Sequence, residues 1–322
     1  MKKRFFASIL VLSILLISCE DNFSPFGSYN EKYVLTCILN SDTTFQTATL
    51  SSSYFTGTFN PDDKVEDRSI KFADIRVWYE DSVYLFKDTM VVETDALNNS
   101  SVKNFYFNDR FKIAFNKPIE IEVLLENGKR LKAKSQTPKD IAFKSNSSVL
   151  IPPVSGNLIN IFWTNGNNSS FYQPKLFFKY SKKVNDVVTF YEAEIPYYFT
   201  SINGSEKAVY PPASNKLSIV YNMDVIAKTL NNLSKDEPEN VTISVYEKLY
   251  FTLSILDQNL SRYASSTSKS FNALTVRVNE NEYTNIEGGL GIFGSYINKI
   301  YDRLRFQSTY IESFGYNYVF QN

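Results

Sequence analysis

The sequence predicts a mainly β protein: an immunoglobulin-like or transthyretin-like sandwich, followed by a β-rich second domain with one or two short helices. The 322 residues include 26 Phe, 22 Tyr and 2 Trp, and aromatic residues are enriched in strands. Segments such as 70–79 alternate apolar and polar side chains, which is typical of half-buried strands. Asn127-Gly128 lies between two further segments of this kind, and that dipeptide is a strong local signal of a β-hairpin.

Residues 1–18 have the layout of a lipoprotein signal peptide. Lys2, Lys3 and Arg4 precede a short apolar run, which ends at Ser18-Cys19. The run is shorter than the roughly 20 apolar residues that span a bilayer. We therefore expect cleavage before Cys19 and lipidation of its thiol, since two or more acyl chains anchor a protein stably in a membrane. The alternative is an N-terminal transmembrane anchor that ends in Ser-Cys.

Residues 19–30 form a polar, turn-forming tether, in which Glu20 and Asp21 follow Cys19 directly. An acidic pair in this place resembles the surface-export signal of lipoproteins in the Bacteroidetes group. We therefore expect a lipid-anchored protein of the outer membrane that faces the cell surface. Without the signal peptide, 31 cationic and 34 anionic side chains remain. This balance does not favour nucleic acid as a partner, because nucleic acid binds basic surfaces.

The first domain is expected over residues 31–138. The β-rich run 33–39 opens it, and Asn127-Gly128 joins its last two strands. Thr137-Pro138 ends it, because proline cannot donate a hydrogen bond to a strand ladder. About seven short strands in this length are typical of a sandwich; the expected strands cover 33–39, 44–50, 70–79, 82–86, 112–115, 119–125 and 130–134.

The second domain is expected over residues 139–322. A helix is predicted over 224–233, with Asp224 as its N-cap and apolar residues at helical spacing. A second short helix is predicted over 257–264. Strand patterns cover the rest of this region, at 159–163, 171–180, 187–195, 217–220, 241–255 and 274–278.

The absence of one residue type limits the chemistry. The chain contains no His, which is the usual general base at neutral pH and the commonest metal ligand. With Cys19 lipidated, Cys37 is the one remaining cysteine, and its place in a β-rich run predicts a buried small hydrophobe. We therefore expect no enzyme activity, no metal site and no cofactor. A hydrolase using only carboxylates stays open as an alternative, but it needs two facing acids, which a sequence cannot show.

The segment Gly289–Gly294 matches the G-x-G-x-x-G pattern of dinucleotide-binding proteins. That pattern binds a nucleotide only inside a complete strand–turn–helix unit, and only 28 residues follow Gly294. We therefore interpret this segment as a glycine-rich structural loop.

The same region carries a resemblance to a known family. Residues 283–295 are similar to the near-C-terminal signature of a Bacteroidetes lipoprotein family, the domain of unknown function DUF4249. The blocks 33–40, 128–138 and 257–263 resemble further parts of that family. The resemblance implies a surface lipoprotein of the kind often associated with TonB-dependent outer-membrane transporters. It implies no catalytic residues.

Exposed aromatic residues give the binding hypothesis. Tyr197, Tyr198 and Tyr210 lie at predicted strand ends or in loops, where binding groups are commonly placed. Their rings could stack on a small ligand, a glycan or a peptide, whereas Trp163 lies in an apolar strand and is expected in the core. We therefore expect a binding protein, an accessory to a TonB-dependent transporter. The alternatives are the carboxylate-only surface hydrolase and a structural or adhesive envelope protein.

Overall fold

A computed structural model describes residues 31–53, 68–94, 100–166, 170–202, 204–235, 237–238, 240–267 and 283–321. The signal peptide, Cys19 and the strand expected over 274–278 lie outside these ranges.

The prediction of a mainly β protein is confirmed. The elements, in chain order, are β1 (Tyr33–Asn40), β2 (Gln46–Ser52), β3 (Asp74–Tyr79), β4 (Ser82–Thr94), β5 (Ser100–Asn108), β6 (Pro118–Leu124), β7 (Arg130–Gln136), β8 (Leu150–Ile151), β9 (Leu158–Phe162), β10 (Tyr172–Val184), β11 (Val187–Ile195), β12 (Tyr198–Ile202), β13 (Ser205–Val209), β14 (Ser218–Asn222), α2 (Met223–Asn231), β15 (Thr242–Leu256), α3 (Gln258–Thr267), β16 (Leu290–Tyr301), β17 (Arg305–Phe306), α4 (Ser308–Glu312) and β18 (Asn317–Val319).

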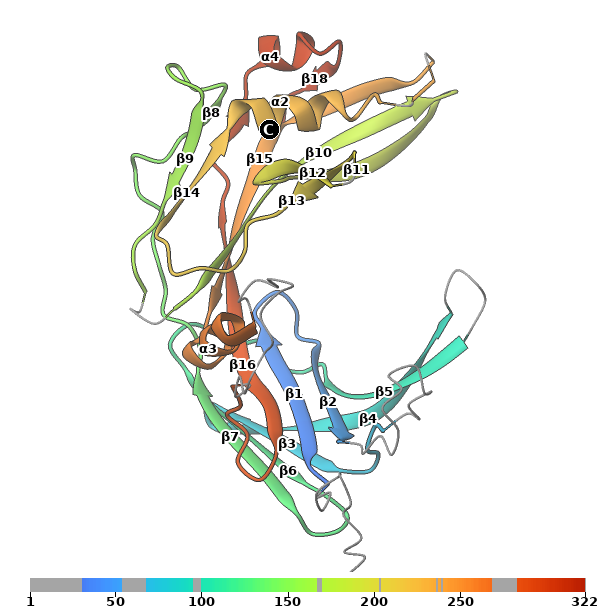
Figure 1. Ribbon diagram of the computed structural model, residues 1–322, viewed down its shortest axis with the longest axis vertical. Helices are drawn as coiled ribbons and strands as arrows, with labels where there is room; N and C mark the ends of the chain where they lie inside the picture. The colour runs from blue at the N-terminus through green and yellow to red at the C-terminus, as the bar shows by residue number, and fades with distance from the viewer. Residues whose placement is uncertain are drawn as a thin grey trace, which may run out of the picture.

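The elements build two modules stacked along the long axis of the molecule (Figure 1). The first module is a sandwich, and β4 belongs to both of its sheets. The first part of β4 pairs with β3, and β6 and β7 extend that sheet. The second part of β4 pairs with β5, and β2 and β1 follow. Alternating buried side chains such as Leu35, Cys37 and Ile121 fill the space between the sheets, as period-two patterns predict.

The second module packs β10 and β15 against the β9–β14 pair and helix α2. Trp163, Phe178 and Phe251 lie in its core, together with Ile226 and Leu230 from the helix. The buried position of Trp163 confirms the sequence prediction. The helix predicted over 224–233 is confirmed as α2, but its N-cap is Asn222 and not Asp224. The Asn222 side chain accepts a hydrogen bond from the Asp224 backbone N–H, the usual task of an N-cap amide.

Strand β16 joins the two modules. Its first half pairs in parallel with β1, and its second half pairs antiparallel with β15. One continuous path of paired strands therefore runs from β11 in the second module to β7 in the first. Ile286, Phe293 and Ile297 pack in the first core, although the sequence analysis assigned all of 139–322 to the second domain.

The glycine-rich segment is therefore a strand and not the expected loop. Gly291 lies opposite Leu35 of β1 and has a φ of 110°, which a residue with a Cβ rarely adopts. A Cβ at this position would lie 2.0 Å from the Leu35 carbonyl oxygen. The glycine allows two backbones to approach closely, and its partner strand lies about 250 residues away in the sequence. Local sequence patterns do not predict a pairing between strands so far apart in the chain.

Candidate functional site

The three tyrosines singled out in the sequence lie together at the base of the β12–β13 hairpin. Tyr198 pairs with Val209, and the Tyr197 backbone N–H donates to the Val209 carbonyl. Tyr210 directly follows Val209, the last residue of β13. All three side chains are exposed, and the Tyr197 and Tyr198 rings meet edge to face with centroids 5.9 Å apart. The structure therefore brings the predicted residues together on one projecting hairpin.

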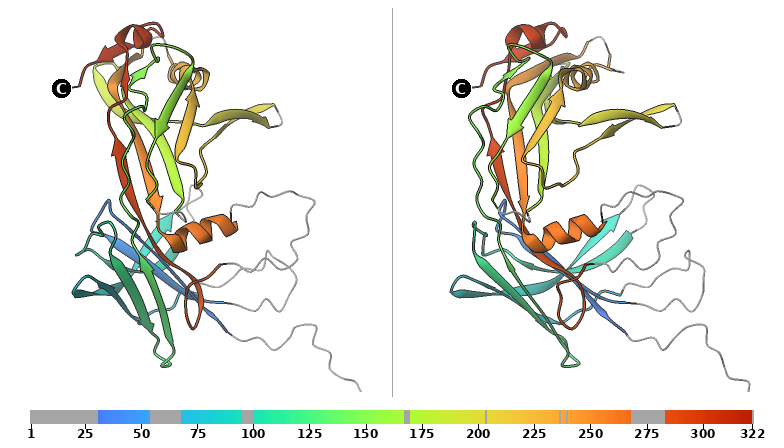
Figure 2. Two further views of the ribbon diagram at one scale, coloured as in Figure 1. Left: turned by 90° about the vertical axis from the view of Figure 1, so that its left-hand side faces the viewer. Right: turned by 60° about the vertical axis from the view of Figure 1, so that its left-hand side comes forward.

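The hairpin is held to α2 by a cation. Lys228 of α2 forms an ion pair with Glu206 and lies 4.9 Å above the Phe199 ring, a favourable cation–π geometry. Tyr197 also contacts the buried Tyr221 ring, with centroids 6.4 Å apart. Burial raises the pKa of the Tyr221 hydroxyl, so this group stays neutral. Figure 2 shows the hairpin projecting from the second module on the same side as α3.

A hollow of about 460 Å³ lies on the face of the continuous sheet where the modules meet. Side chains from β1, β10, β15, β16 and α3 line it, so residues of both modules contribute. It contains one cation, one carboxylate, two amides, two hydroxyls and a tyrosine above an apolar floor. The lining residues are Ile38, Asp42, Gln173, Lys175, Thr252, Ser254, Leu256, Leu260, Tyr296 and Asn298.

The polar groups of this hollow are held by the sheet. Asn298 donates from Nδ2 to Asp42 Oδ2 at 2.6 Å, which fixes the carboxylate at one side. Thr252 and Ser254 alternate along β15 and face the same way. Donors and acceptors above an apolar floor can orient a small polar ligand, and the volume falls in the range of known ligand sites. Tyr197, Tyr198 and Tyr210 are not among the residues that line it.

A second hollow, of about 270 Å³, contains the buried Asp257. The Oδ1 atom of Asp257 accepts from the Leu260 N–H at 2.8 Å, and so caps α3. Its Oδ2 atom accepts from the Ser135 and Ser295 hydroxyls at 2.8 and 2.9 Å. Burial raises the pKa of the carboxyl, and these hydrogen bonds oppose that shift. Asp257 therefore ties β7, β16 and α3 together at the junction.

This acid does not have the surroundings of a paired-acid hydrolase. Glycoside hydrolysis of that kind needs two carboxyl groups facing the same bond. Asp257 is the one carboxylate among the residues that line its hollow, and both of its oxygens are engaged by neighbours in the fold. Asp74, Glu192 and Glu194 lie on β3 and β11 and outside this hollow.

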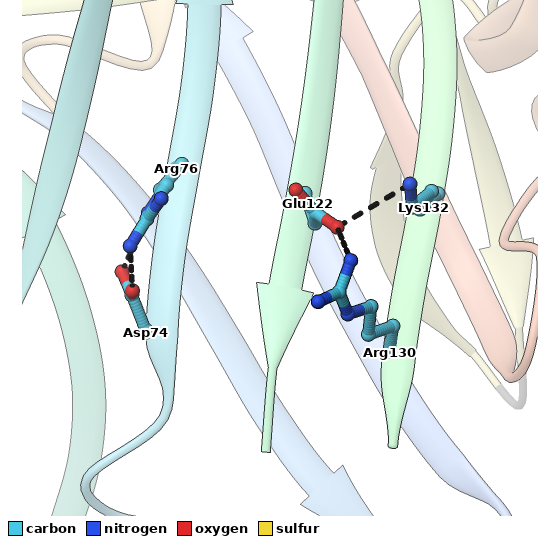
Figure 3. Close-up of polar contacts among 5 residues, drawn as sticks. All are labelled: Asp74, Arg76, Glu122, Arg130 and Lys132. Carbon is cyan, nitrogen blue, oxygen red and sulfur yellow. Dashed lines mark hydrogen bonds and ion pairs between the residues drawn. The ribbon is translucent and has the colours of Figure 1, made fainter. Parts of the chain in front are cut away.

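The outer face of the β3–β6–β7 sheet carries paired charges instead of a site. Glu122 accepts from Arg130 at 3.4 Å and lies 3.3 Å from the Lys132 amine. On the neighbouring strand β3, Arg76 pairs with Asp74 of the same strand, as Figure 3 shows. Exposed pairs of this type contribute little stability, because water screens them. The face is thus a charged, solvated surface.

Within the described ranges, no group of three or more His, Cys, Asp or Glu side chains is placed to hold a metal ion. No helix in that part of the chain has the length and apolarity needed to cross a membrane. Cys37 is buried and unpaired, as predicted, and burial raises the pKa of its thiol. A scan against protein-family models gave no match, and a search of curated proteins gave none either.

Sequence reasoning missed the junction hollow entirely. Its residues come from five elements and the β1–β2 loop, spread between Ile38 and Asn298, and the pairing of β1 with β16 brings them together. Gln173, Lys175 and Thr252 alternate with buried neighbours on their strands, so the period-two pattern marks them as exposed. The pattern carries no information on which strand lies beside which.

Proposed function

We propose that this chain is a binding protein of the outer membrane, anchored by lipid on Cys19 and facing the cell surface. The observation that carries the binding role is the hollow between the modules, which gathers donors, acceptors and one aromatic ring above an apolar floor. Such a lining orients ligands, and it lacks a nucleophile paired with a base. The ligand site is thus built by the junction, and β16 fixes its shape.

The anchor and the partner rest on sequence features. The signal-peptide layout before Cys19 and the acidic pair after it support attachment to the outer membrane. The family resemblance supports an accessory role beside a TonB-dependent transporter, which would receive the captured ligand. A Cys19→Ala variant tests the anchor: it should lose radiolabelled palmitate and leave the membrane fraction. Retention of the label in Cys19→Ala would contradict lipidation at this residue.

The lining favours a small ligand rich in hydroxyl or amide groups, such as a glycan fragment or a short peptide. Gln173 and Asn298 supply amides, and Thr252 and Ser254 supply hydroxyls, which pair with such groups in either direction. The Tyr296 ring and the apolar floor suit the less polar face of a sugar or a peptide side chain. Lys175 and Asp42 give the site one charge of each sign.

A matched pair of variants tests this site. Thr252→Trp places a large ring in the hollow, whereas Thr242→Trp makes the same change at an exposed position of the same strand. A panel of oligosaccharides and short peptides is screened by thermal shift, and each hit is titrated by calorimetry. We expect at least about tenfold weaker binding to Thr252→Trp and unchanged binding to Thr242→Trp. A panel without hits, or equal binding to both variants, would contradict the proposal.

A further inference from the structure

Strand β11 ends the continuous sheet with an uncovered edge. It pairs with β10 over nine residues, and no described strand lies on its other side. Residues 187–192 are all exposed, with Val187 and Phe190 at 66% and 69%. Figure 1 shows the β10–β11 hairpin extending sideways from the second module. A long, apolar and unprotected edge is a template for pairing with another chain.

The opposite edge of the same sheet is protected. Strand β7 carries Arg130, Lys132 and Lys134 on its outer face, and charged side chains, Lys above all, discourage strand pairing. The Lys132 backbone also exchanges hydrogen bonds with Glu287, which covers part of that edge. Strand β11 contains no Lys or Arg, and no described segment bridges to it.

The β11 edge is held in a strand conformation before any partner arrives. The nine pairs with β10 follow one another without a bulge. The Tyr191 ring stacks on Tyr180 with centroids 5.2 Å apart, and the Phe190 ring lies 6.3 Å from Tyr246. A preformed strand lowers the entropy cost of adding another strand beside it. This hairpin is therefore suited to accept an extended segment.

The charges on this edge select the partner. Acidic side chains flank the apolar centre, with Asp186 before it and Glu192 and Glu194 after it. Asp186 pairs with Lys183 and Glu192 with Lys179, both on β10, so a partner's cation would share these exposed carboxylates from the free side of β11. A second copy of β11 fits poorly in the two registers that centre its apolar residues on each other. In an antiparallel pair about a two-fold axis at Thr189 or Phe190, Asp186 would face Glu192 or Glu194, and like charges placed opposite are destabilising. A strand with basic ends matches the edge.

We propose that β11 binds an extended segment of a partner protein by strand addition, and that this segment alternates apolar residues and has cationic ends. Main-chain hydrogen bonds to the free edge give the affinity, as in other strand-addition complexes. Apolar side chains of the segment cover Val188 and Phe190, and its cations face Glu192 and Asp186. The surface is separate from the junction hollow, so the two proposals stand or fall independently.

A synthetic peptide tests this edge. The probe is a nine-residue fluorescent peptide of alternating Val and Thr with Lys at both ends, and the full chain is titrated into it by fluorescence anisotropy. We expect saturable binding that weakens at least about tenfold when the end residues are Glu, because the charged side chains of β11 itself are all anionic. Two further peptides carry N-methyl groups on the odd-numbered or on the even-numbered residues. One of the two should lose binding, because its methyl groups replace the N–H donors that pair with β11.

Variants of the chain locate the binding. Val188→Lys with Phe190→Lys adds the charges that protect natural edges, and should weaken the Lys-ended peptide at least about tenfold. Val83→Lys makes a similar change at an exposed apolar position of β4 and should leave binding unchanged, as should Thr252→Trp. A melting curve confirms that each variant is folded.

Three results would overturn the inference. They are absence of binding by the Lys-ended peptide, equal binding of the Lys-ended and Glu-ended peptides, and binding that survives the double lysine variant. Sedimentation velocity tests whether a second copy of the chain binds the edge instead. If the wild type self-associates and the double lysine variant does not, the edge pairs with a second copy and the proposed partner segment is wrong.

Discussion

The two ends of the continuous sheet differ in how they meet the solvent. At one end, β7 and its neighbours β3 and β6 present paired charges, such as Glu122 with Lys132, on their outer face. At the other end, β11 presents Val187, Val188 and Phe190 on a strand that contains no Lys or Arg. The junction hollow lies between them. From this difference we propose that the β3–β6–β7 face belongs to a scaffold, while the β11 edge and the junction carry surfaces suited to contact.

The largest effect is expected where the two modules are joined. In Gly291→Ala the new Cβ would lie 2.0 Å from the Leu35 carbonyl oxygen, at a φ that alanine tolerates poorly. We expect this variant to lose about 3–5 kcal/mol of unfolding free energy, measured by urea denaturation, because it combines a backbone clash with conformational strain.

Gly315→Ala is the matched control for this substitution. Gly315 also has a positive φ, but a Cβ there would meet no atom within 4 Å. Strain alone should then cost about 1–2 kcal/mol. Equal losses in the two variants would show that the close approach of β16 to β1 does not matter to the fold.

The second effect concerns the acid that ties the modules together. Asp257→Ala removes the cap of α3 and the acceptor of two serine hydroxyls. We expect a loss of about 2–4 kcal/mol in unfolding free energy, the sum of a lost cap and unsatisfied buried groups. Hydrogen exchange should show faster exchange in α3, with β3 unchanged. Uniform exchange across both elements would contradict a local role.

The pH dependence of Asp257 has a defined sign. Burial raises the pKa of its carboxyl in the folded chain, so the folded state binds the proton more tightly than the unfolded state. This contribution to stability is complete below the unfolded pKa of about 3.9 and is lost as the pH rises through the folded pKa. Relative to Asp257→Asn, the wild type should therefore lose unfolding free energy as the pH increases from the unfolded pKa of Asp257 to its raised folded pKa. A gain would contradict the direction of the shift.

A smaller effect is expected at the protected edge. Lys132→Val with Lys134→Val removes the cations that discourage strand pairing at β7. Sedimentation velocity should then detect a concentration-dependent oligomer that the wild type does not form. Lys139→Val with Lys144→Val removes as many cations outside the strands and should not form it. An oligomer in both variants would mean that lost solubility, and not the edge, is the cause.

The smallest effect belongs to the charged face. Glu122→Gln removes a carboxylate that pairs with Arg130 and Lys132 at the surface. The unfolding free energy should change by about 0.5 kcal/mol or less, since exposed ion pairs are screened by water. The difference should shrink further in 0.5 M salt. A loss that salt does not reduce would show that this face does more than keep the scaffold soluble.

Local patterns predicted much of the fold. Alternation identified β3 and β6, Asn127-Gly128 identified the β6–β7 hairpin, and helical spacing identified α2. The N-cap was misplaced because Asn222 ends a strand directly before the helix. The pairing of β16 with β1 was beyond prediction, because register between strands so distant in sequence depends on tertiary packing.

The site was predicted less well than the fold. Tyr197, Tyr198 and Tyr210 are exposed and adjacent, as strand ends and loops suggested. The junction hollow depends on the β1–β16 and β15–β16 pairs, which leave no trace in the composition of either partner. The free edge of β11 was likewise invisible, since a strand pattern does not reveal whether its second neighbour exists.

The most direct measurement is cross-linking and purification of the tagged protein from detergent-solubilised outer membranes, with mass spectrometry of the recovered proteins. We expect a TonB-dependent barrel in a stoichiometric amount, with cross-links on the second module and the junction and few on the β3–β6–β7 face. Recovery of the tagged protein alone, under conditions that keep comparable complexes intact, would contradict the proposed accessory role. A barrel cross-linked mainly to the β3–β6–β7 face would contradict the division between scaffold and contact surface.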